Sequence, residues 1–107
     1  MTVSSLGLTP QDMECLLQIL SRYAPLAEIW AFGSRVAGNA RLFSDIDLVI
    51  IQDNPLELQA KAELRYALSE STLPIKVDIV EWVRTNPAFR EIIQRNHIVL
   101  KSGSNAA

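Results

Sequence analysis

Residues 29–51 read IWAFGSRVAGNARLFSDIDLVII. Short apolar runs rich in β-branched or aromatic residues stand at both ends of this stretch, over residues 29–32 and residues 45–51. Such runs are typical of buried strands. Gly33 is expected to end the first strand, and a brief helical turn is expected over residues 34–38. The link between the two strands is too short for a full crossover helix, which predicts a mixed sheet.

Three helices are predicted outside this stretch, one before it and two after it. Thr9-Pro10 begins the first, which ends near residues 23–25, and Asn54-Pro55 and Asn86-Pro87 are expected to begin the second and third. The residues expected to face the core recur at helical spacing: Met13, Leu16, Leu17 and Leu20; Leu56, Ala60, Leu64, Ala67 and Leu68; and Phe89, Ile92 and Ile93.

A third strand is predicted over residues 75–82, after Pro74, and residues 98–100 leave room for a short fourth strand. The expected fold class is therefore α/β (α+β), with a small mixed three-stranded sheet flanked by helices. We expect a single domain over residues 1–107, with a frayed tail from about residue 102.

Composition excludes several classes of function. Lys and Arg together number 10 against 12 Asp and Glu, so the net charge is −2 and direct nucleic-acid binding is not expected. The one cysteine, Cys15, permits no intramolecular disulfide and no multi-cysteine zinc site. No signal peptide and no membrane-length apolar run are apparent, so a cytoplasmic protein is expected.

The first feature with chemical meaning is Gly33-Ser34, which follows a strand and opens a helical turn. A glycine lets a ligand approach the backbone closely. Free N–H groups at a helix start and a serine hydroxyl attract phosphate. An ordinary turn is the alternative interpretation of this pair.

The second feature is a set of three carboxylates. Asp45 and Asp47 should point to one side of their strand, about 6.6 Å apart, and two like charges there are costly unless a cation lies between them. A solvated strand end is the alternative. Asp78 lies within the third strand among apolar residues and needs a partner, which either a metal ion or Lys76 could supply.

Together these residues suit phosphoryl-group chemistry. Three convergent carboxylates can hold two Mg²⁺ ions, which stabilise the attacking and leaving oxygens of an in-line displacement. Arg35 and Arg41 could neutralise a leaving pyrophosphate.

The pattern Gly-Ser, ten residues, Asp-x-Asp and a later strand aspartate resembles the polymerase-β-type nucleotidyltransferase superfamily. Gly33-Ser34-Arg35 with Gly38, followed by residues 44–48 (SDIDL), more narrowly resembles the minimal nucleotidyltransferase (MNT) antitoxins, which are encoded beside HEPN-domain ribonuclease toxins. The resemblance covers nearly the whole chain.

The resemblance implies a role for each site residue. Gly33 and Ser34, with Arg35 and Arg41, would bind the triphosphate. Asp45, Asp47 and Asp78 would be the catalytic metal ligands, and Asp78 would help activate the acceptor hydroxyl.

The implied reaction transfers AMP from ATP, with Mg²⁺, to a hydroxyl of a HEPN toxin, for which a tyrosine is expected. A hetero- or homo-oligomer is compatible with this function. Many relatives carry a basic residue where this chain has Ala37, which leaves the phosphate contacts to the two arginines. The alternatives are an antitoxin that masks its toxin without catalysis and a small-molecule nucleotidyltransferase that needs a partner subunit.

Three further expectations concern aromatic and loop residues. Leu42 and Phe43 are apolar residues in the predicted loop over residues 39–44, where they would border the acceptor or fold back on the core. His97 is expected at the surface or as a helix cap. Trp30 and Trp82 are expected in strands.

Overall fold

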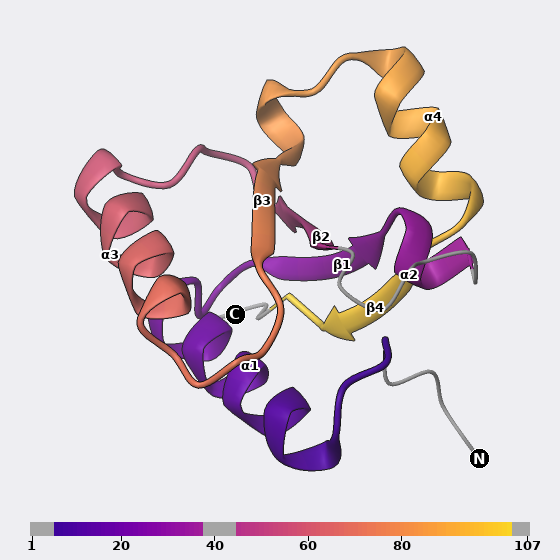
Figure 1. Ribbon diagram of the computed structural model, residues 1–107. Helices are drawn as coiled ribbons and strands as arrows, with labels where there is room; N and C mark the ends of the chain where they lie inside the picture. Colours follow the sequence, from indigo (N-terminus) through magenta and orange to yellow (C-terminus); the bar gives the residue numbers. More distant parts are fainter. Residues whose placement is uncertain (1–5, 38–44, 104–107) are drawn as a thin grey trace.

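The computed structural model describes residues 6–37 and 45–103 (Figure 1). Its elements follow one another as α1 (Pro10–Tyr23), β1 (Glu28–Phe32), α2 (Ser34–Ala37), β2 (Ile46–Ile51), α3 (Leu58–Ser69), β3 (Val77–Glu81), the 3-10 helix η1 (Trp82–Arg84), α4 (Pro87–Arg95) and β4 (Ile98–Lys101). The predicted α/β class is confirmed.

The strands form one mixed sheet in the order β3-β2-β1-β4. β1 is antiparallel to both β2 and β4, and β2 is parallel to β3. α3 supplies the crossover that a parallel pair requires. The mixed sheet is confirmed, and the short terminal strand is present as β4 beside β1, so this sheet has four strands rather than three.

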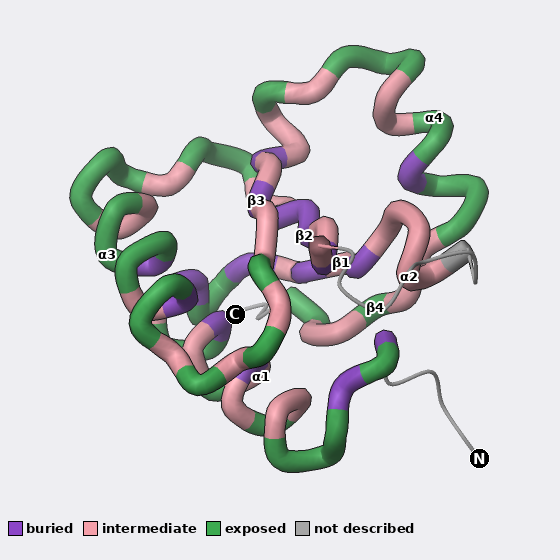
Figure 2. The backbone as a smooth tube through the Cα atoms, viewed as in Figure 1, coloured by how far each residue is buried: buried purple, intermediate pink, exposed green. Residues whose placement is uncertain are grey.

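α1 and α3 lie together on one face of the sheet (Figure 1). The core between these helices and the strands is made of residues at most 1% exposed, as the buried stretches in Figure 2 show: Leu16, Leu20, Ile29, Ala31, Ile46, Leu48, Ile50 and Leu64. The strand members of this set alternate along β1 and β2, so every second side chain points to the opposite face.

α4 lies on the side of the sheet away from α1 and α3 (Figure 1). The ring of its Phe89 packs edge-on against Phe32 of β1 at 5.7 Å, and Ile93 is fully buried. The expectation that Ile92 points inward is wrong, because this side chain is 60% exposed. Phe89 and Ile93 are one turn apart and form a narrow contact stripe, and Ile92, which precedes Ile93, is rotated away from it.

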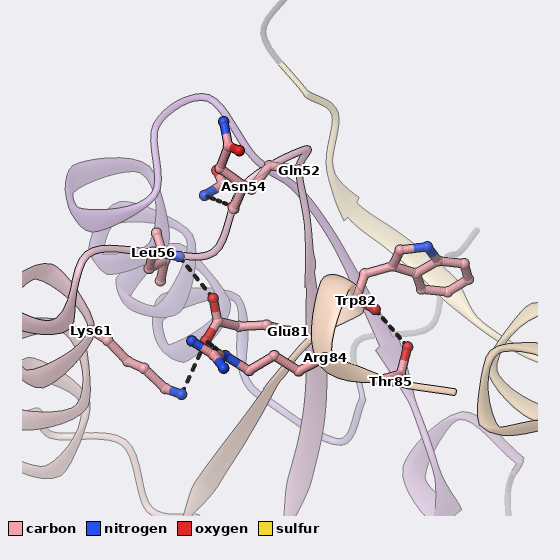
Figure 3. Close-up of polar contacts among 8 residues, drawn as sticks. All are labelled: Gln52, Asn54, Leu56, Lys61, Glu81, Trp82, Arg84 and Thr85. Atoms are coloured by element: carbon pink, nitrogen blue, oxygen red, sulfur yellow. Dashed lines mark hydrogen bonds and ion pairs between the residues drawn. The ribbon is translucent and has the colours of Figure 1, made fainter. Parts of the chain in front are cut away.

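The predicted start of the second helix is also wrong. α3 begins at Leu58 rather than at Asn54-Pro55. The N–H of Leu56 donates a hydrogen bond of 2.8 Å to the carboxylate of Glu81, which holds the preceding segment in a non-helical path (Figure 3). A tertiary contact therefore overrides the local helix-start signal.

The third strand is shorter than predicted, because Trp82 leaves the sheet and begins η1. Three donors contact its carbonyl oxygen: the Thr85 hydroxyl at 2.6 Å, the Thr85 N–H at 3.0 Å and the Arg90 guanidinium at 2.7 Å. These bonds replace the ladder bond that a longer strand would make. The expectation that Trp82 belongs to a strand is therefore wrong.

Candidate functional site

One row of side chains crosses the sheet on the face opposite α1 and α3. Asp47 of β2 is the register partner of Phe32 in β1 and of Asp78 in β3. Ile46 and Leu48, on either side of Asp47, point into the core, so the Asp47 carboxylate points to the other face. Adjacent strands lie about 4.8 Å apart. The fold thus brings together two of the three carboxylates that the sequence singled out.

Gly33 directly follows β1 and lies against this row. Its φ is +88°, a conformation that favours glycine, and a Cβ at this position would overlap the carboxylate of Asp47. The carbonyl of Gly33 accepts a 3.1 Å hydrogen bond from the N–H of Val36, which turns the chain into α2. Ser34 is the first residue of α2. The predicted Gly-Ser turn therefore lies beside Asp47.

The electrostatic environment of Asp47 is unfavourable for a charge. Burial raises the pKa of this carboxyl group, and the negative charges of Asp78 and Asp45 raise the pKa further. Asp45 lies immediately before β2, so Asp47 feels the negative charges of carboxylates from its own strand end and from β3. A bound cation would relieve this repulsion.

Lys76 lies beside Asp78, as expected if the partner of this carboxylate is Lys76 rather than a metal ion. Its Nζ lies 3.7 Å from the Asp78 carboxylate, and the two side chains are 72% and 45% exposed. An ion pair so open to solvent is weak. Lys76 therefore leaves the Asp78 carboxylate available to other ligands.

The donor set can be compared with what a metal ion needs. Within the part of the chain that the structure describes, no three His, Cys, Asp or Glu side chains are gathered closely enough to hold a metal ion as they stand. Mg²⁺ is commonly held by only one or two carboxylates, with substrate phosphates and water completing its shell. Asp47 and Asp78, with Asp45 nearby, fit that requirement in number and in chemistry.

Arg35 makes a contact that the sequence did not predict. Its guanidinium donates a 2.7 Å hydrogen bond to the carbonyl of Leu6, which is 2% exposed. A Cβ on Gly7, whose φ is +80°, would lie 2.6 Å from the same guanidinium. Arg35 therefore anchors the segment before α1 next to α2. Arg41, Leu42 and Phe43 belong to residues 38–44, outside the described part of the chain.

An aromatic cluster lies next to the carboxylate row. Trp30 is on the same face of β1 as Phe32, and its indole stacks on the ring of His97 at 3.9 Å and meets Trp82 edge-on at 5.7 Å. Arg90 lies over Trp82 at 5.1 Å. His97 is half-buried in this stack, and its Nδ1 lies 3.2 Å from the carbonyl oxygen of Gln94 in the last turn of α4, as the expected helix cap would. No local pattern could have revealed the stacking of His97 on Trp30, because the two residues are distant in the sequence.

Glu81 is the second residue that the sequence reasoning missed. It is 3% exposed and accepts the N–H of Leu56, while Lys61 lies 3.0 Å and Arg84 3.2 Å from its carboxylate (Figure 3). Burial alone would raise the pKa of Glu81, but the hydrogen bonds from Leu56, Lys61 and Arg84 and the charge of Lys61 hold this pKa below its usual value. This network ties the start of α3 to the end of β3, the strand that carries Asp78.

A mixed sheet that presents acidic side chains from two neighbouring strands beside a Gly-Ser turn defines a nucleotidyltransferase. A family model described as Polymerase beta, Nucleotidyltransferase matches residues 14–106. The chain belongs to this family and, within it, to the minimal nucleotidyltransferases. The resemblance inferred from residues 33–48 is thereby confirmed.

Relatives of this chain agree with that assignment. The chain is 40% identical to the probable protein adenylyltransferase MntA of Haemophilus influenzae over 98 residues, which cover 92% of this chain and 86% of that protein. Its fold is similar to that of a toxin–antitoxin crystal structure with AMP-PNP (TM-score 0.70, 24% identity, 88% and 75% of the two chains). It is also similar to a complex of the tri-AMPylated Shewanella oneidensis HEPN toxin with an MNT antitoxin (TM-score 0.64, 21% identity, 90% and 73%).

None of the helices within residues 6–37 and 45–103 is both long enough and apolar enough to cross a membrane.

Proposed function

We propose that this chain is an antitoxin enzyme that transfers AMP from ATP to a tyrosine hydroxyl of a HEPN ribonuclease toxin, with Mg²⁺, in the cytoplasm. The observation that carries the proposal is the pairing of Asp47 with Asp78 beside Gly33. Support also comes from the name of the Haemophilus influenzae relative and from the HEPN toxin in the Shewanella oneidensis complex. We infer that a single domain carries the site and that the toxin is held in a hetero-oligomer.

The proposed reaction is a displacement at the α-phosphorus of ATP. The acceptor oxygen forms a bond to phosphorus, the bond from phosphorus to the pyrophosphate oxygen breaks, and the hydroxyl proton passes to the Asp78 carboxylate. Gly33 and Ser34 would hold the outer phosphates, and Arg35 and Arg41 would neutralise the leaving pyrophosphate.

Metal chemistry would support this displacement. Asp45, Asp47 and Asp78 would hold two Mg²⁺ ions, which when bound supply positive charge for the phosphate oxygens. The raised pKa of Asp47 supports this assignment, because the carboxylates repel one another until a cation joins them.

Intact mass spectrometry tests the proposal directly. The purified protein is mixed with Mg-ATP and the product of the adjacent reading frame, which we expect to be helical with an Arg-x4–6-His motif. The partner should gain one or more AMP units, and Asp47→Asn protein should add none. A toxin silenced equally well by both proteins, without a change in mass, would instead identify a masking antitoxin.

A further inference from the structure

Two left-handed residues in succession precede α1. Leu6 has a φ of +57° and Gly7 has a φ of +80°. Glycine adopts this conformation readily, but in leucine the Cβ is crowded by the following carbonyl oxygen. Leu6 is 2% exposed and belongs to the hydrophobic core, so the packing of its side chain holds the backbone in this conformation. Backbone strain of this kind persists only where the surrounding structure imposes it, and it is concentrated at functional sites.

The turn formed by Leu6 and Gly7 receives the side chain of Arg35. The Leu6 carbonyl accepts a 2.7 Å hydrogen bond from Nη1 of Arg35. A Cβ on Gly7 would lie 2.6 Å from the same nitrogen, which is closer than a side-chain carbon can come. Gly7 is therefore required twice, for its left-handed φ and for the space that the guanidinium occupies.

Arg35 connects this turn to the candidate active site. It lies in α2, two residues after Gly33, whose backbone lies against the Asp47 carboxylate. A helix of four residues such as α2 is not stable by itself, so side-chain contacts must fix its place. Val36 packs against the core, and Arg35 donates to Leu6. These contacts help to hold the Gly33 turn beside the carboxylate row.

A purely structural explanation accounts for only part of this arrangement. Arg35 ties the segment before α1 to α2, and that tie by itself would stabilise the protein. Such a tie does not require strain, because a carbonyl in ordinary extended backbone can accept the same hydrogen bond. A leucine held in the left-handed region lowers stability, and here it determines where one guanidinium lies. The strain is better explained by a need to place Arg35 accurately.

We propose that the Leu6-Gly7 turn is a positioning element for the triphosphate of ATP. By fixing Arg35, the turn fixes α2 and the Gly33-Ser34 pair, to which the proposed function assigns the outer phosphates. Leu6 and Gly7 act through Arg35 rather than by contact with the nucleotide. The inference rests on the proposed function and adds the segment before α1 to its nucleotide site. The effect is reciprocal, because a turn that strengthens ATP binding is itself stabilised when ATP binds.

Binding of a nucleotide that cannot transfer AMP tests the proposal. The probe is α,β-methylene-ATP with Mg²⁺, and its affinity for the intact protein is measured by calorimetry. Gly7→Ala should weaken binding about tenfold, because the added Cβ displaces the guanidinium. In the AMP-transfer assay the same variant should raise the KM for ATP by a similar factor and should change kcat much less.

A double-mutant cycle shows whether Gly7 acts through Arg35. Arg35→Ala and the double variant Gly7→Ala, Arg35→Ala should bind the analogue with equal affinity, because the second change has no guanidinium left to displace. Leu68→Ala is the matched control, since it truncates a core side chain that is 8% exposed near the end of α3. This control should melt at a lower temperature, as Gly7→Ala does, and should keep the wild-type affinity.

Hydrogen exchange in the wild-type protein adds a test that needs no change at Gly7. Saturating analogue should slow amide exchange over residues 6–9 by about fivefold or more. This protection should be absent from Arg35→Ala at a concentration of analogue that saturates the variant. Exchange therefore decides the matter even if Gly7→Ala does not fold.

The outcomes separate the inference from the proposed function. If the wild-type protein binds the analogue and Gly7→Ala binds it equally tightly, the inference is overturned and the proposed function stands. The same conclusion follows if the losses of the two single variants multiply in the double variant, if Leu68→Ala weakens binding as much as Gly7→Ala, or if the analogue leaves exchange over residues 6–9 unchanged. If the wild-type protein does not bind the analogue with Mg²⁺ at all, the proposed function itself fails.

Discussion

Asp47 and Asp78 face each other as register partners of the parallel strands β2 and β3, although a whole helix separates them in the sequence. Like charges placed directly opposite each other in a sheet are destabilising. The chain tolerates this cost at the place where a Gly-Ser turn also meets the sheet. Such a local conflict with stability is characteristic of functional sites.

The substitution Asp47→Asn should abolish AMP transfer and raise the thermal melting temperature. The pKa of Asp47 lies above its ordinary value of 3.8 in the folded protein, so ionising this group opposes folding. Stability is therefore lost as the pH rises through that pKa. Melting curves from about pH 3 to about pH 8 should show variant and wild type converging at the acid end.

A control separates this effect from a general change of charge. Asp53→Asn removes a negative charge from an exposed position just after β2. Asp53→Asn should leave AMP transfer unchanged and should not reproduce the pH-dependent rise in melting temperature. Transfer that survives Asp47→Asn, or continues in excess chelator, would contradict the metal-ligand role.

Gly33→Ala should destabilise the protein and abolish transfer. At φ +88° an alanine is strained by on the order of 1–3 kcal/mol, and its Cβ would displace the Asp47 carboxylate. Urea unfolding and a transfer assay measure the two effects. Gly103→Ala is the matched control, since a Cβ there meets its neighbours at an ordinary 3.5 Å. A fully active Gly33→Ala protein would show that the close approach is unnecessary.

Arg35→Ala should loosen the segment before α1. The hydrogen bond to the Leu6 carbonyl is charge-assisted, so its loss should cost about 1.5–3 kcal/mol and expose that segment to proteases. We also expect weaker binding of ATP, because this guanidinium is proposed to contact phosphate. Arg22→Ala, which removes a cation–π contact with Tyr23 and no contact with the segment before α1 among the described residues, serves as the control. Unchanged ATP affinity in Arg35→Ala would limit this residue to a structural role.

Glu81→Ala should be strongly destabilising. It leaves the N–H of Leu56 and the charges of Lys61 and Arg84 without their acceptor. Breaking a buried pair costs about 3–5 kcal/mol, and we expect a lower loss of roughly 2–3 kcal/mol because Arg84 is largely exposed. Glu81→Gln keeps one acceptor oxygen and should cost less.

The pH dependence of the Glu81 effect has the opposite sign to that of Asp47. The pKa of Glu81 is held below its ordinary value of 4.5, so its contribution is complete above that pH and is lost as the pH falls through the folded-state pKa. The stability gap between wild type and Glu81→Gln should therefore narrow in acid. Glu14→Gln, at an exposed site on α1, should show no such trend. A gap independent of pH would rule out a charged role for Glu81.

Local patterns in the sequence were sufficient for much of the fold and for the outline of the site. Thr9 caps α1 by accepting the N–H of Asp12, and Asn86 caps α4 by accepting the N–H of Phe89, as the residue types predicted. The Gly33 turn follows β1 as expected. These features depend on neighbours within a few residues, which is the range over which residue types and periodicity carry information.

Only the tertiary structure decided which distant groups meet. The register that sets Asp47 opposite Asp78, the hydrogen bond from Arg35 to Leu6 and the stacking of His97 on Trp30 each join separate elements. The hydrogen bond from Leu56 to Glu81 also joins separate elements. Because of it, α3 begins at Leu58 and not at the Asn54-Pro55 start that the local sequence predicted. Such contacts gain their free energy from packing and strand pairing between remote segments, and a local pattern carries no information about which remote segment will be adjacent.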